Sequence, residues 1–314
     1  MPIKGGLAMG DKLKEKELLE YFLNKMGLDT PFMIHQAFLG YQFQKSKGKN
    51  SEMDDTLPTK LIKMYYSLNI GEVEFDNLRK NFRSRYVQNE SKLEGVHGKE
   101  EIKGLKAVYD YLHSEEISEY FSIYSLKDIH RKLYSYTPHS EAGGEYRKID
   151  VYLPNTGINL CSWDLIPSEL HRLSPNVDNL HTIAQEIRAT GDVDLLLEFL
   201  DHCVDLKCNL IKIHPFVDGN GRTIRAFTNK LLEDAGLPAI YIKANEREKY
   251  EKAMQLAIGE ENDRRMIKTF YRYKVCDSIV ELDIKHRINP KNIEQTGSSQ
   301  FQKKISISFD DYDI

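Results

Sequence analysis

The chain is most informative at residues 214–225, which read HPFVDGNGRTIR. These residues follow a long apolar run, and Pro215 favours leaving a helix at that point. The run Gly219-Asn220-Gly221 tolerates positive φ, so it suits a tight turn. A new helix is then predicted over 222–234. The stretch therefore predicts two helices joined by a glycine turn.

The chemistry of this turn suits a phosphorylated ligand. A glycine turn that enters a helix presents unpaired backbone N–H groups and the positive end of the helix dipole, so it attracts anions. Arg222 and Arg225 are three residues apart and share a helical face beside it, and two guanidiniums suit several phosphates. Asp218 could hold Mg²⁺ next to those phosphates, and His214 could deprotonate a hydroxyl near neutral pH. Together they predict transfer of a phosphorus-centred group from a nucleotide to an alcohol.

Helical periodicity dominates the rest of the chain. The run 193–213 is the clearest case, because its apolar residues keep a spacing that is typical of a helix at the centre of a bundle. Residues 146–163 differ, since they are rich in β-formers around the turn signal 154–157 and predict a β-hairpin. We therefore expect an all-α fold, a helical bundle with one small β-hairpin. Further helices are predicted near 75–88, 99–113, 126–136, 177–190, 246–257 and 266–284, and two more apolar stripes lie at 18–26 and 61–68.

Composition bounds the function. Of 314 residues, 44 are Lys or Arg and 48 are Asp or Glu, which gives a net charge of -4 and disfavours a membrane-surface binder or a general nucleic-acid coat. The four cysteines form no metal-ligand pattern, and the nearest pair, Cys203 and Cys208, is five apart. With no leader and no run of 18 apolar residues, we expect reduced thiols and a cytoplasmic protein that binds neither membranes nor nucleic acid.

Residues 214–225 resemble the signature of the Fic family, HxFx[D/E]GNGRxxR, at every defined position. The resemblance implies a Fic-type helical core and an enzyme that transfers AMP from ATP to a Ser, Thr or Tyr hydroxyl of a target protein, or of itself, releasing pyrophosphate. It implies ATP as substrate and Mg²⁺ as cofactor. The Doc relatives, which phosphorylate, carry Lys where Gly221 stands, so Gly221 favours nucleotidyl transfer here.

The resemblance also assigns roles to single residues. It implies that His214 is the base, that Asp218 binds Mg²⁺, that the glycine turn cradles the phosphates, that Arg222 steadies their charge and that Arg225 grips the γ-phosphate. Tyr250 falls where the family has a tyrosine near the adenine. The residues implied to line the nucleotide are Val151, Tyr152, Leu153, Pro154, Asp218, Gly219, Asn220, Gly221, Arg222, Thr223, Arg225 and Tyr250.

The predicted hairpin over 146–163 falls at the position of the family's flap. A flap is an edge strand that pairs with an extended segment of the target, so the partner would be a protein with such a segment. Some relatives carry Asn eight residues after the position of Tyr250, where this chain has Ile258. Which nucleobase the enzyme prefers is therefore left open.

A second motif lies upstream at residues 90–95, which read ESKLEG. It resembles the family's inhibitory helix, [S/T]xxxE[G/N], in the arrangement where that helix precedes the core. The resemblance implies that Glu94 pairs with Arg225 and takes the place of the γ-phosphate. The chain departs from the pattern, because Glu90 stands where Ser or Thr is usual and Ser91 comes one place late, which weakens the expected anchoring of this helix.

The expected organisation is an N-terminal helical region over 1–85, a Fic domain over 86–285 that includes the inhibitory helix and flap, and a flexible C-terminal tail over 286–314. Three alternatives stay open for the function: removal of AMP by the same site, transfer of another nucleotide such as UMP, and a non-catalytic nucleotide-sensing module. The sequence gives neither the target nor whether the chain forms a homo-oligomer.

Overall fold

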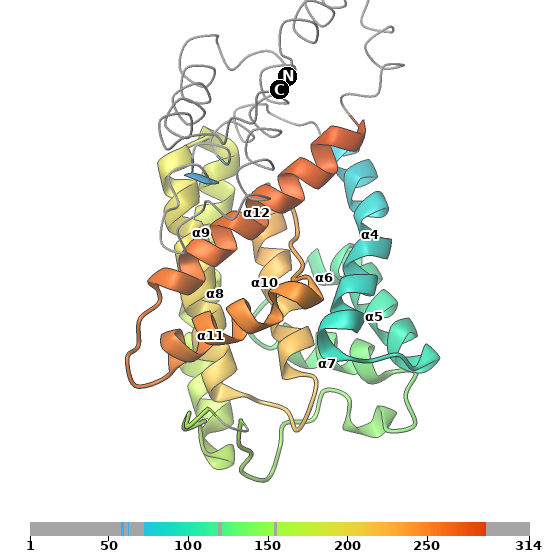
Figure 1. Ribbon diagram of the computed structural model, residues 1–314, viewed down its shortest axis with the longest axis vertical. Helices are drawn as coiled ribbons and strands as arrows, with labels where there is room; N and C mark the ends of the chain where they lie inside the picture. The colour runs from blue at the N-terminus through green and yellow to red at the C-terminus, as the bar shows by residue number, and fades with distance from the viewer. Residues whose placement is uncertain (1–57, 60–61, 63–71, 119–120, 154–155, 287–314) are drawn as a thin grey trace, which may run out of the picture. The chain divides into compact units, whose positions relative to one another are not determined.

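The computed structural model in Figure 1 describes residues 58–59, 62, 72–118, 121–153 and 156–286. Internal contacts divide the chain into residues 51–278 and a second unit of 1–50 with 279–314. Of the second unit only 279–286 is described, so the predicted stripe at 18–26 and the predicted tail after residue 286 lie outside the described residues. All the predicted site residues belong to 51–278.

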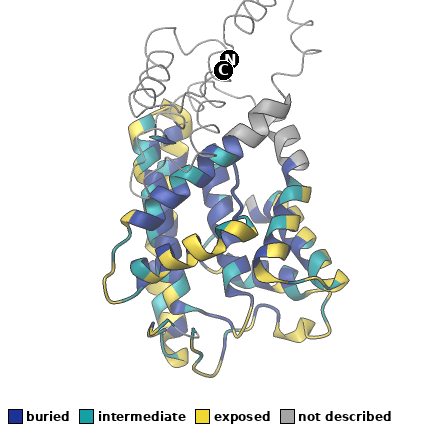
Figure 2. Ribbon diagram, in the orientation of Figure 1, coloured by how far each residue is buried: buried dark blue, intermediate teal, exposed yellow. Residues whose placement is uncertain are grey.

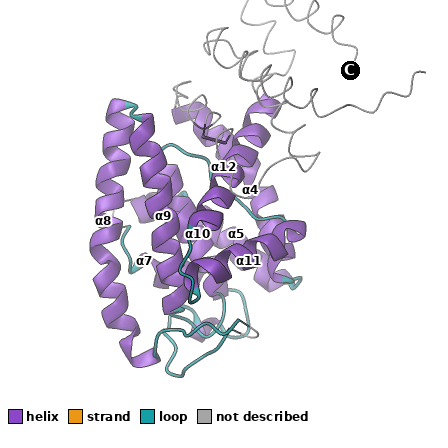
Figure 3. Ribbon diagram, turned by 60° about the vertical axis from the view of Figure 1, so that its left-hand side comes forward, coloured by secondary structure: helices purple, strands orange, loops and turns teal. Residues whose placement is uncertain are grey.

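The described part of the chain is helical, as Figure 3 shows, and no strand occurs in it. This agrees with the predicted all-α bundle. In the same part, no helix combines the length and the apolar character that a membrane crossing requires. The α-helices are α4 (Glu72–Glu94), α5 (Lys99–Leu112), α6 (Glu115–Ser118), α7 (Ser125–Tyr134), α8 (Ile166–Thr190), α9 (Val193–Ile213), α10 (Asn220–Asp234), α11 (Arg247–Ile258) and α12 (Arg265–His286), and the short 3-10 turns are η1 (Ser140–Ala142), η2 (Trp163–Leu165) and η3 (Ala244–Glu246).

Helices α8 and α9 show how the sequence sets element ends. Helix α9 has the predicted bounds: Asp192 caps it by accepting hydrogen bonds from the N–H groups of residues 194 and 195, at 2.9 and 3.0 Å. Helix α8 starts at residue 166, eleven residues before the predicted start at 177. Pro167 lies in its first turn, where proline is favoured because the first N–H groups of a helix have no partner within it. It ends at Gly191, whose φ of 69° reverses the chain into α9.

Helix α10 occupies the centre of the bundle. It contacts α5, α7, α8 and α9, and Figure 2 shows it buried along most of its length. A polar residue on such a helix needs a partner or a ligand, because burial removes its water. The helix that follows the signature turn is therefore the element around which the polar site is built.

The predicted β-hairpin at 146–163 is absent from the described residues of that segment, which are extended or turn-like without strand pairing. Its backbone hydrogen bonds go elsewhere: the N–H of Arg147 donates to the carbonyl of Pro215 at 2.9 Å, and that of Cys161 to the carbonyl of Lys212 at 3.0 Å. Two of its carbonyls, those of Ile149 and Cys161, accept from the Arg147 guanidinium. The pattern of β-formers was correct for extended backbone and wrong for strand pairing.

The predicted domain boundary at residue 85 falls inside α4, which runs unbroken from Glu72 to Glu94. Helix α12 reaches His286, two residues beyond the predicted end of the last helix.

Candidate active site

His214 stands where α9 ends. Its φ of 52° and ψ of 63° lie in the left-handed region, which is uncommon for a residue other than glycine, and its N–H still donates to the carbonyl of Leu210 at 2.9 Å. The ring Nδ1 lies 3.3 Å from the carbonyl of Ile211. A proton on Nδ1 satisfies that contact and leaves the lone pair of Nε2 available. Burial lowers the pKa of His214, so the neutral, basic form prevails at pH 7.

Asn220 shapes the turn. Its buried side chain accepts from the N–H of Phe216 at 2.9 Å and donates to the carbonyl of Phe216 at 2.8 Å. Gly219 caps α10 with a φ of 74°, and a Cβ there would lie 3.0 Å from the ring of Tyr134. The first turn of α10 begins at Asn220, and its backbone N–H groups have no partner within the helix, so they suit an anion.

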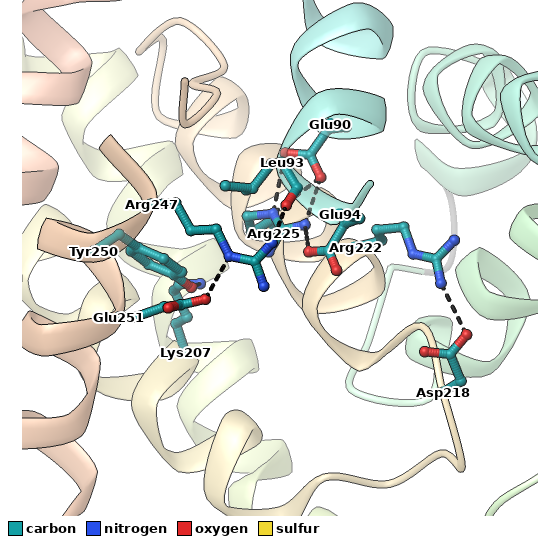
Figure 4. A network of polar contacts seen from close by, with 10 residues as sticks. All are labelled: Glu90, Leu93, Glu94, Lys207, Asp218, Arg222, Arg225, Arg247, Tyr250 and Glu251. Atoms are coloured by element: carbon teal, nitrogen blue, oxygen red, sulfur yellow. Dashed lines mark hydrogen bonds and ion pairs between the residues drawn. The ribbon is translucent and has the colours of Figure 1, made fainter. Parts of the chain in front are cut away.

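Asp218 lies on the outer side of the turn with three-quarters of its side chain exposed. One carboxylate oxygen, Oδ2, accepts from Nη2 of Arg222 at 3.0 Å, as Figure 4 shows. The same oxygen accepts from the Tyr134 hydroxyl at 2.6 Å. Partial burial acts to raise the pKa of Asp218, but the Tyr134 hydroxyl, the N–H of Gly219 and Arg222 together hold it below its usual value. In the described part of the chain, Oδ1 has no side-chain donor, so that oxygen can accept a further ligand.

Helix α7 supports the turn from behind through residues that the sequence interpretation missed. Nδ1 of His130 accepts from the N–H of Gly144 at 2.8 Å, so Nε2–H donates to the backbone carbonyl of Asp218 at 3.0 Å. The ring stacks on Phe216 with centroids 3.8 Å apart. Burial lowers the pKa of His130 to about 4, which keeps this tautomer fixed at neutral pH. The detectable signal was the four-residue spacing of His130 and Tyr134 on one helical face.

Arg225 is buried and contacts two carboxylates of α4, as Figure 4 shows. Nε and Nη2 donate to Oε2 of Glu90 at 2.9 and 2.7 Å, and Nη2 also pairs with Glu94. The predicted contact between Glu94 and Arg225 is confirmed. The contact of Glu90 was missed, although its i, i+4 spacing to Glu94 puts both carboxylates on one face of the helix.

The end of α4 fixes where Glu94 lies. Gly95 has a φ of 69°, and the N–H of Val96 donates back to the carbonyl of Ser91 at 3.0 Å, which closes the helix one residue after Glu94. From α11, Nη1 of Arg247 donates to the carbonyl of Leu93 at 3.0 Å. Burial acts to raise the pKa of Glu94, but the charge and hydrogen bond of Arg225 outweigh it and lower that pKa.

Gly221 lies against this ion pair. A Cβ at that position would approach Nη1 of Arg225 to 2.9 Å and Oε1 of Glu94 to 3.1 Å. The two site arginines, Arg222 and Arg225, are therefore both paired with carboxylates. Of the two carboxylates that pair with Arg225, that of Glu94 is 31% exposed and that of Glu90 is fully buried.

The other predicted residues differ in how far they are exposed. Thr223 is fully buried, and its hydroxyl has no hydrogen-bond partner among the residues that the structure describes. Tyr250 is buried, and its hydroxyl accepts from Lys207 at 2.8 Å. In the extended segment, Tyr152 is 83% exposed and its neighbours Val151 and Leu153 are half-buried. Pro154 lies outside the described residues.

Metal donors are sparse. In the described residues, no group of three or more His, Cys, Asp or Glu side chains could hold a metal ion, and the four cysteines form no disulfide with one another. A cation at this site would have Asp218 as its protein ligand and would take its other ligands from a bound substrate and from water, an arrangement that Mg²⁺ commonly adopts.

Residues 120–232 match the Fic/DOC family. Among curated proteins, the chain is 30% identical over 163 residues to a protein adenylyltransferase Fic of Culex quinquefasciatus and 29% identical over 159 residues to one of Aedes aegypti. Each match covers 50% of this chain and 29% of the relative, so the chain spans less than a third of the length of these curated relatives.

Two solved structures share the fold. A Fic-domain-containing signalling protein from Bacteroides thetaiotaomicron aligns with a TM-score of 0.56 at 17% identity, covering 72% of this chain and 96% of that one. A variant of Fic-1 from C. elegans aligns with a TM-score of 0.55 at 15% identity, covering 90% of this chain and 99% of that one. At these identities the likeness concerns the fold.

Proposed function

We propose that this chain is a protein adenylyltransferase, a proposal supported by the match of residues 120–232 to the Fic/DOC family. It moves AMP from ATP onto a Ser, Thr or Tyr hydroxyl of a target protein, or of itself, and releases pyrophosphate. The observation that carries the proposal is the assembly of His214, Asp218 and the glycine turn at the start of α10, beside Arg222 and Arg225. Each of these residues has a role in one transfer reaction.

In this reaction, Nε2 of His214 takes the proton of the target hydroxyl, whose oxygen attacks the α-phosphorus of ATP. A bond forms between that oxygen and the α-phosphorus, and the bond from phosphorus to the bridging oxygen of the leaving pyrophosphate breaks. The first N–H groups of α10 and the Arg222 guanidinium stabilise the negative charge that develops. The low pKa of His214 leaves its lone pair free before the hydroxyl arrives.

Asp218 is proposed as the Mg²⁺ ligand. Tyr134 and Arg222 hold the carboxylate by Oδ2 alone, which suits an ion that takes one protein oxygen and completes its shell with phosphates and water. Bound there, Mg²⁺ would neutralise phosphate charge. The protein's own part is to orient that carboxylate and to keep it ionised.

Glu94 is proposed to restrain the enzyme. Its carboxylate occupies Nη2 of Arg225, one of the donors that a γ-phosphate would use, and a desolvated arginine–carboxylate pair competes directly with an arginine–phosphate pair. Because Glu94 is partly exposed, it is the member of the cluster that can leave. Displacing it would expose Arg225 to ATP.

The segment 146–162 is proposed to hold the target. Its exposed Ile149 and Tyr152 offer apolar contacts. Its described residues have extended backbone near His214, which suits an extended stretch of a protein partner. We propose that the reaction takes place in the cytoplasm, a compartment in which thiols such as those of Cys161 and Cys203 stay reduced.

Intact-protein mass spectrometry tests the proposal. The purified protein, Glu94→Gly and the double variant Glu94→Gly/His214→Ala are incubated with MgATP. We expect Glu94→Gly to gain the mass of AMP faster than the native chain, and the double variant to lose this gain by at least about 100-fold, since a positioned base contributes roughly 10²–10⁴ in rate. ATP binding should persist in the double variant.

Equal modification with and without His214 would contradict the proposed mechanism. Two further arms separate the alternatives: a panel of nucleoside triphosphates reports the preferred base, and release of AMP from protein that was modified beforehand reports the reverse reaction.

A further inference from the structure

Arg147 is a fully buried arginine in the extended segment, outside the residues assigned to the transfer reaction. The carboxylate nearest to it in the described residues is that of Asp150, which lies 3.4 Å from Nη1. A buried guanidinium normally has a close counter-ion, because removing it from water is costly. Arg147 is instead surrounded mainly by backbone carbonyls.

Three of these carbonyls follow one another where α9 ends. Nε donates to the carbonyl of His214 at 2.8 Å and Nη2 to that of Ile213 at 3.3 Å, while the backbone N–H of Arg147 donates to that of Pro215 at 2.9 Å. The last carbonyls of a helix have no partner within it, so these contacts close the C-terminal end of α9. They also hold His214 in its left-handed conformation, which a residue with a Cβ adopts at a cost.

The other contacts hold the extended segment together. Nη1 donates to the carbonyl of Ile149 at 2.8 Å, and Nη2 donates to the carbonyl of Cys161. Residues 149 and 161 lie near the two ends of the segment, and Asp150 ties them again by accepting from the N–H of Trp163 at 3.0 Å. In a hairpin, hydrogen bonds between the two strands would join the ends of this segment. Here the Arg147 side chain joins them, and it also bonds both ends to the backbone of His214.

The charge of Arg147 also acts on His214. Four influences set the protonation of this imidazole: its burial, the carbonyl of Ile211, the Arg147 cation and the Asp218 carboxylate. Burial and the Arg147 cation favour the neutral ring, while the carbonyl and the Asp218 carboxylate favour the charged one. A cation bonded to the backbone carbonyl of His214 is well placed to keep Nε2 unprotonated.

We propose that Arg147 is a positioning residue: it holds the segment 146–162 against the backbone of His214, and so fixes the direction in which the imidazole points. The inference rests on the proposed function in that His214 is taken as the base. The contacts themselves can be tested without any transfer activity.

The first measurement uses nuclear magnetic resonance on the native chain and on Arg147→Lys, Arg147→Gln and the control Arg172→Gln, which removes an exposed arginine of α8. In the native chain we expect His214 to titrate below pH 6.5 and the Nε–H of Arg147 to exchange slowly with solvent. Arg147→Gln should raise the pKa of His214, since the cation is lost. Arg147→Lys, which keeps the charge, and Arg172→Gln should leave it unchanged.

The second measurement compares kcat, KM for ATP and the dissociation constant for ATP in the Glu94→Gly background. Both Arg147 variants should lower kcat by about 10- to 100-fold, the usual cost of misplacing a reacting group by about 1 Å, while ATP binds as before. The acid limb of the pH profile should move to higher pH in Arg147→Gln alone. A purely structural arginine would lower the stability and leave that limb in place.

Rapid exchange of the Arg147 Nε–H in the native chain would overturn the proposal, and so would an unshifted His214 in Arg147→Gln. The native-chain measurement decides the matter even if both variants fail to fold. If the imidazole behaves as expected and no variant transfers a nucleotide, the positioning role of Arg147 stands and the proposed function fails.

Discussion

Glu90 and Glu94 contact the same guanidinium but differ in exposure, and this difference separates their roles. Glu90 is fully buried and bidentate to Arg225, so it is the permanent counter-ion of that arginine, while Glu94 reaches it from the partly exposed end of α4. Removing one member of a buried pair leaves an uncompensated charge. Glu90 stands where the inhibitory pattern has Ser or Thr, and it is this residue that holds Arg225 in place.

Glu90→Ala should therefore lower the free energy of unfolding by about 3–5 kcal/mol, the usual cost of breaking a buried pair. The matched change Glu94→Ala should lower it by less than about 1 kcal/mol, as for partly exposed pairs. Urea denaturation of the two variants beside the native chain measures both values. Equal losses would show that the two carboxylates are equivalent.

The state of His214 predicts the pH dependence of the reaction. Its folded-state pKa lies below the ordinary 6.5, mainly because of burial, so the neutral base persists to lower pH than a free imidazole would allow. The acid limb of kcat in Glu94→Gly should fall below pH 6.5. Stopped assays across pH 5 to 9 measure it, and a limb above 6.5 would mean that a different group is the base.

At the scale of elements, α7 acts as the support of the signature turn. Tyr134 donates to Asp218, and His130 holds the backbone of the same residue. Partners of a metal-binding carboxylate orient it, and their loss typically lowers metal affinity by about 10–100-fold. The support comes from a helix that ends eighty residues before the turn begins, which explains why the signature itself did not reveal it.

Tyr134→Phe removes this hydroxyl and keeps the ring that packs beside Gly219. In the Glu94→Gly background, we expect the Mg²⁺ concentration for half-maximal activity to rise about 10-fold. Tyr136→Phe, at an exposed tyrosine two residues away, is the control and should leave it unchanged. An unchanged Mg²⁺ requirement in Tyr134→Phe would show that the Tyr134 hydroxyl of α7 does not contribute to Mg²⁺ binding.

The sequence predicted the elements well where the signal was local. The bounds of α9 follow from its apolar spacing. The turn before α10 follows from its glycines, but α10 begins at Asn220 and not at the predicted 222, so Gly219 is the residue of the turn with a positive φ. The hairpin failed because Arg147, a single side chain, supplies the hydrogen bonds that strands would have exchanged. A pattern of β-formers cannot show that an arginine within the same segment donates to backbone carbonyls of that segment and of the end of α9.

For residues 51–278 as a whole, the site is an assembly around one central helix. The end of α4, the helix α7, the segment 146–162 and the turn 214–219 all meet α10 or the residues beside it. The sequence predicted that the signature residues gather at one glycine turn beside Arg222 and Arg225. The partners of those residues could not, because they come from segments that only the fold brings together.

Retention of label from ATP by Glu94→Gly tests the central claim most directly. Parallel reactions use ATP labelled at the α-phosphate and ATP labelled at the γ-phosphate, and the protein is then separated from free nucleotide. Transfer of AMP predicts that the protein keeps the α-label, loses it when His214 is also replaced by Ala, and never keeps the γ-label. Retention of the γ-label would instead indicate phosphoryl transfer, and retention of neither label would contradict the account.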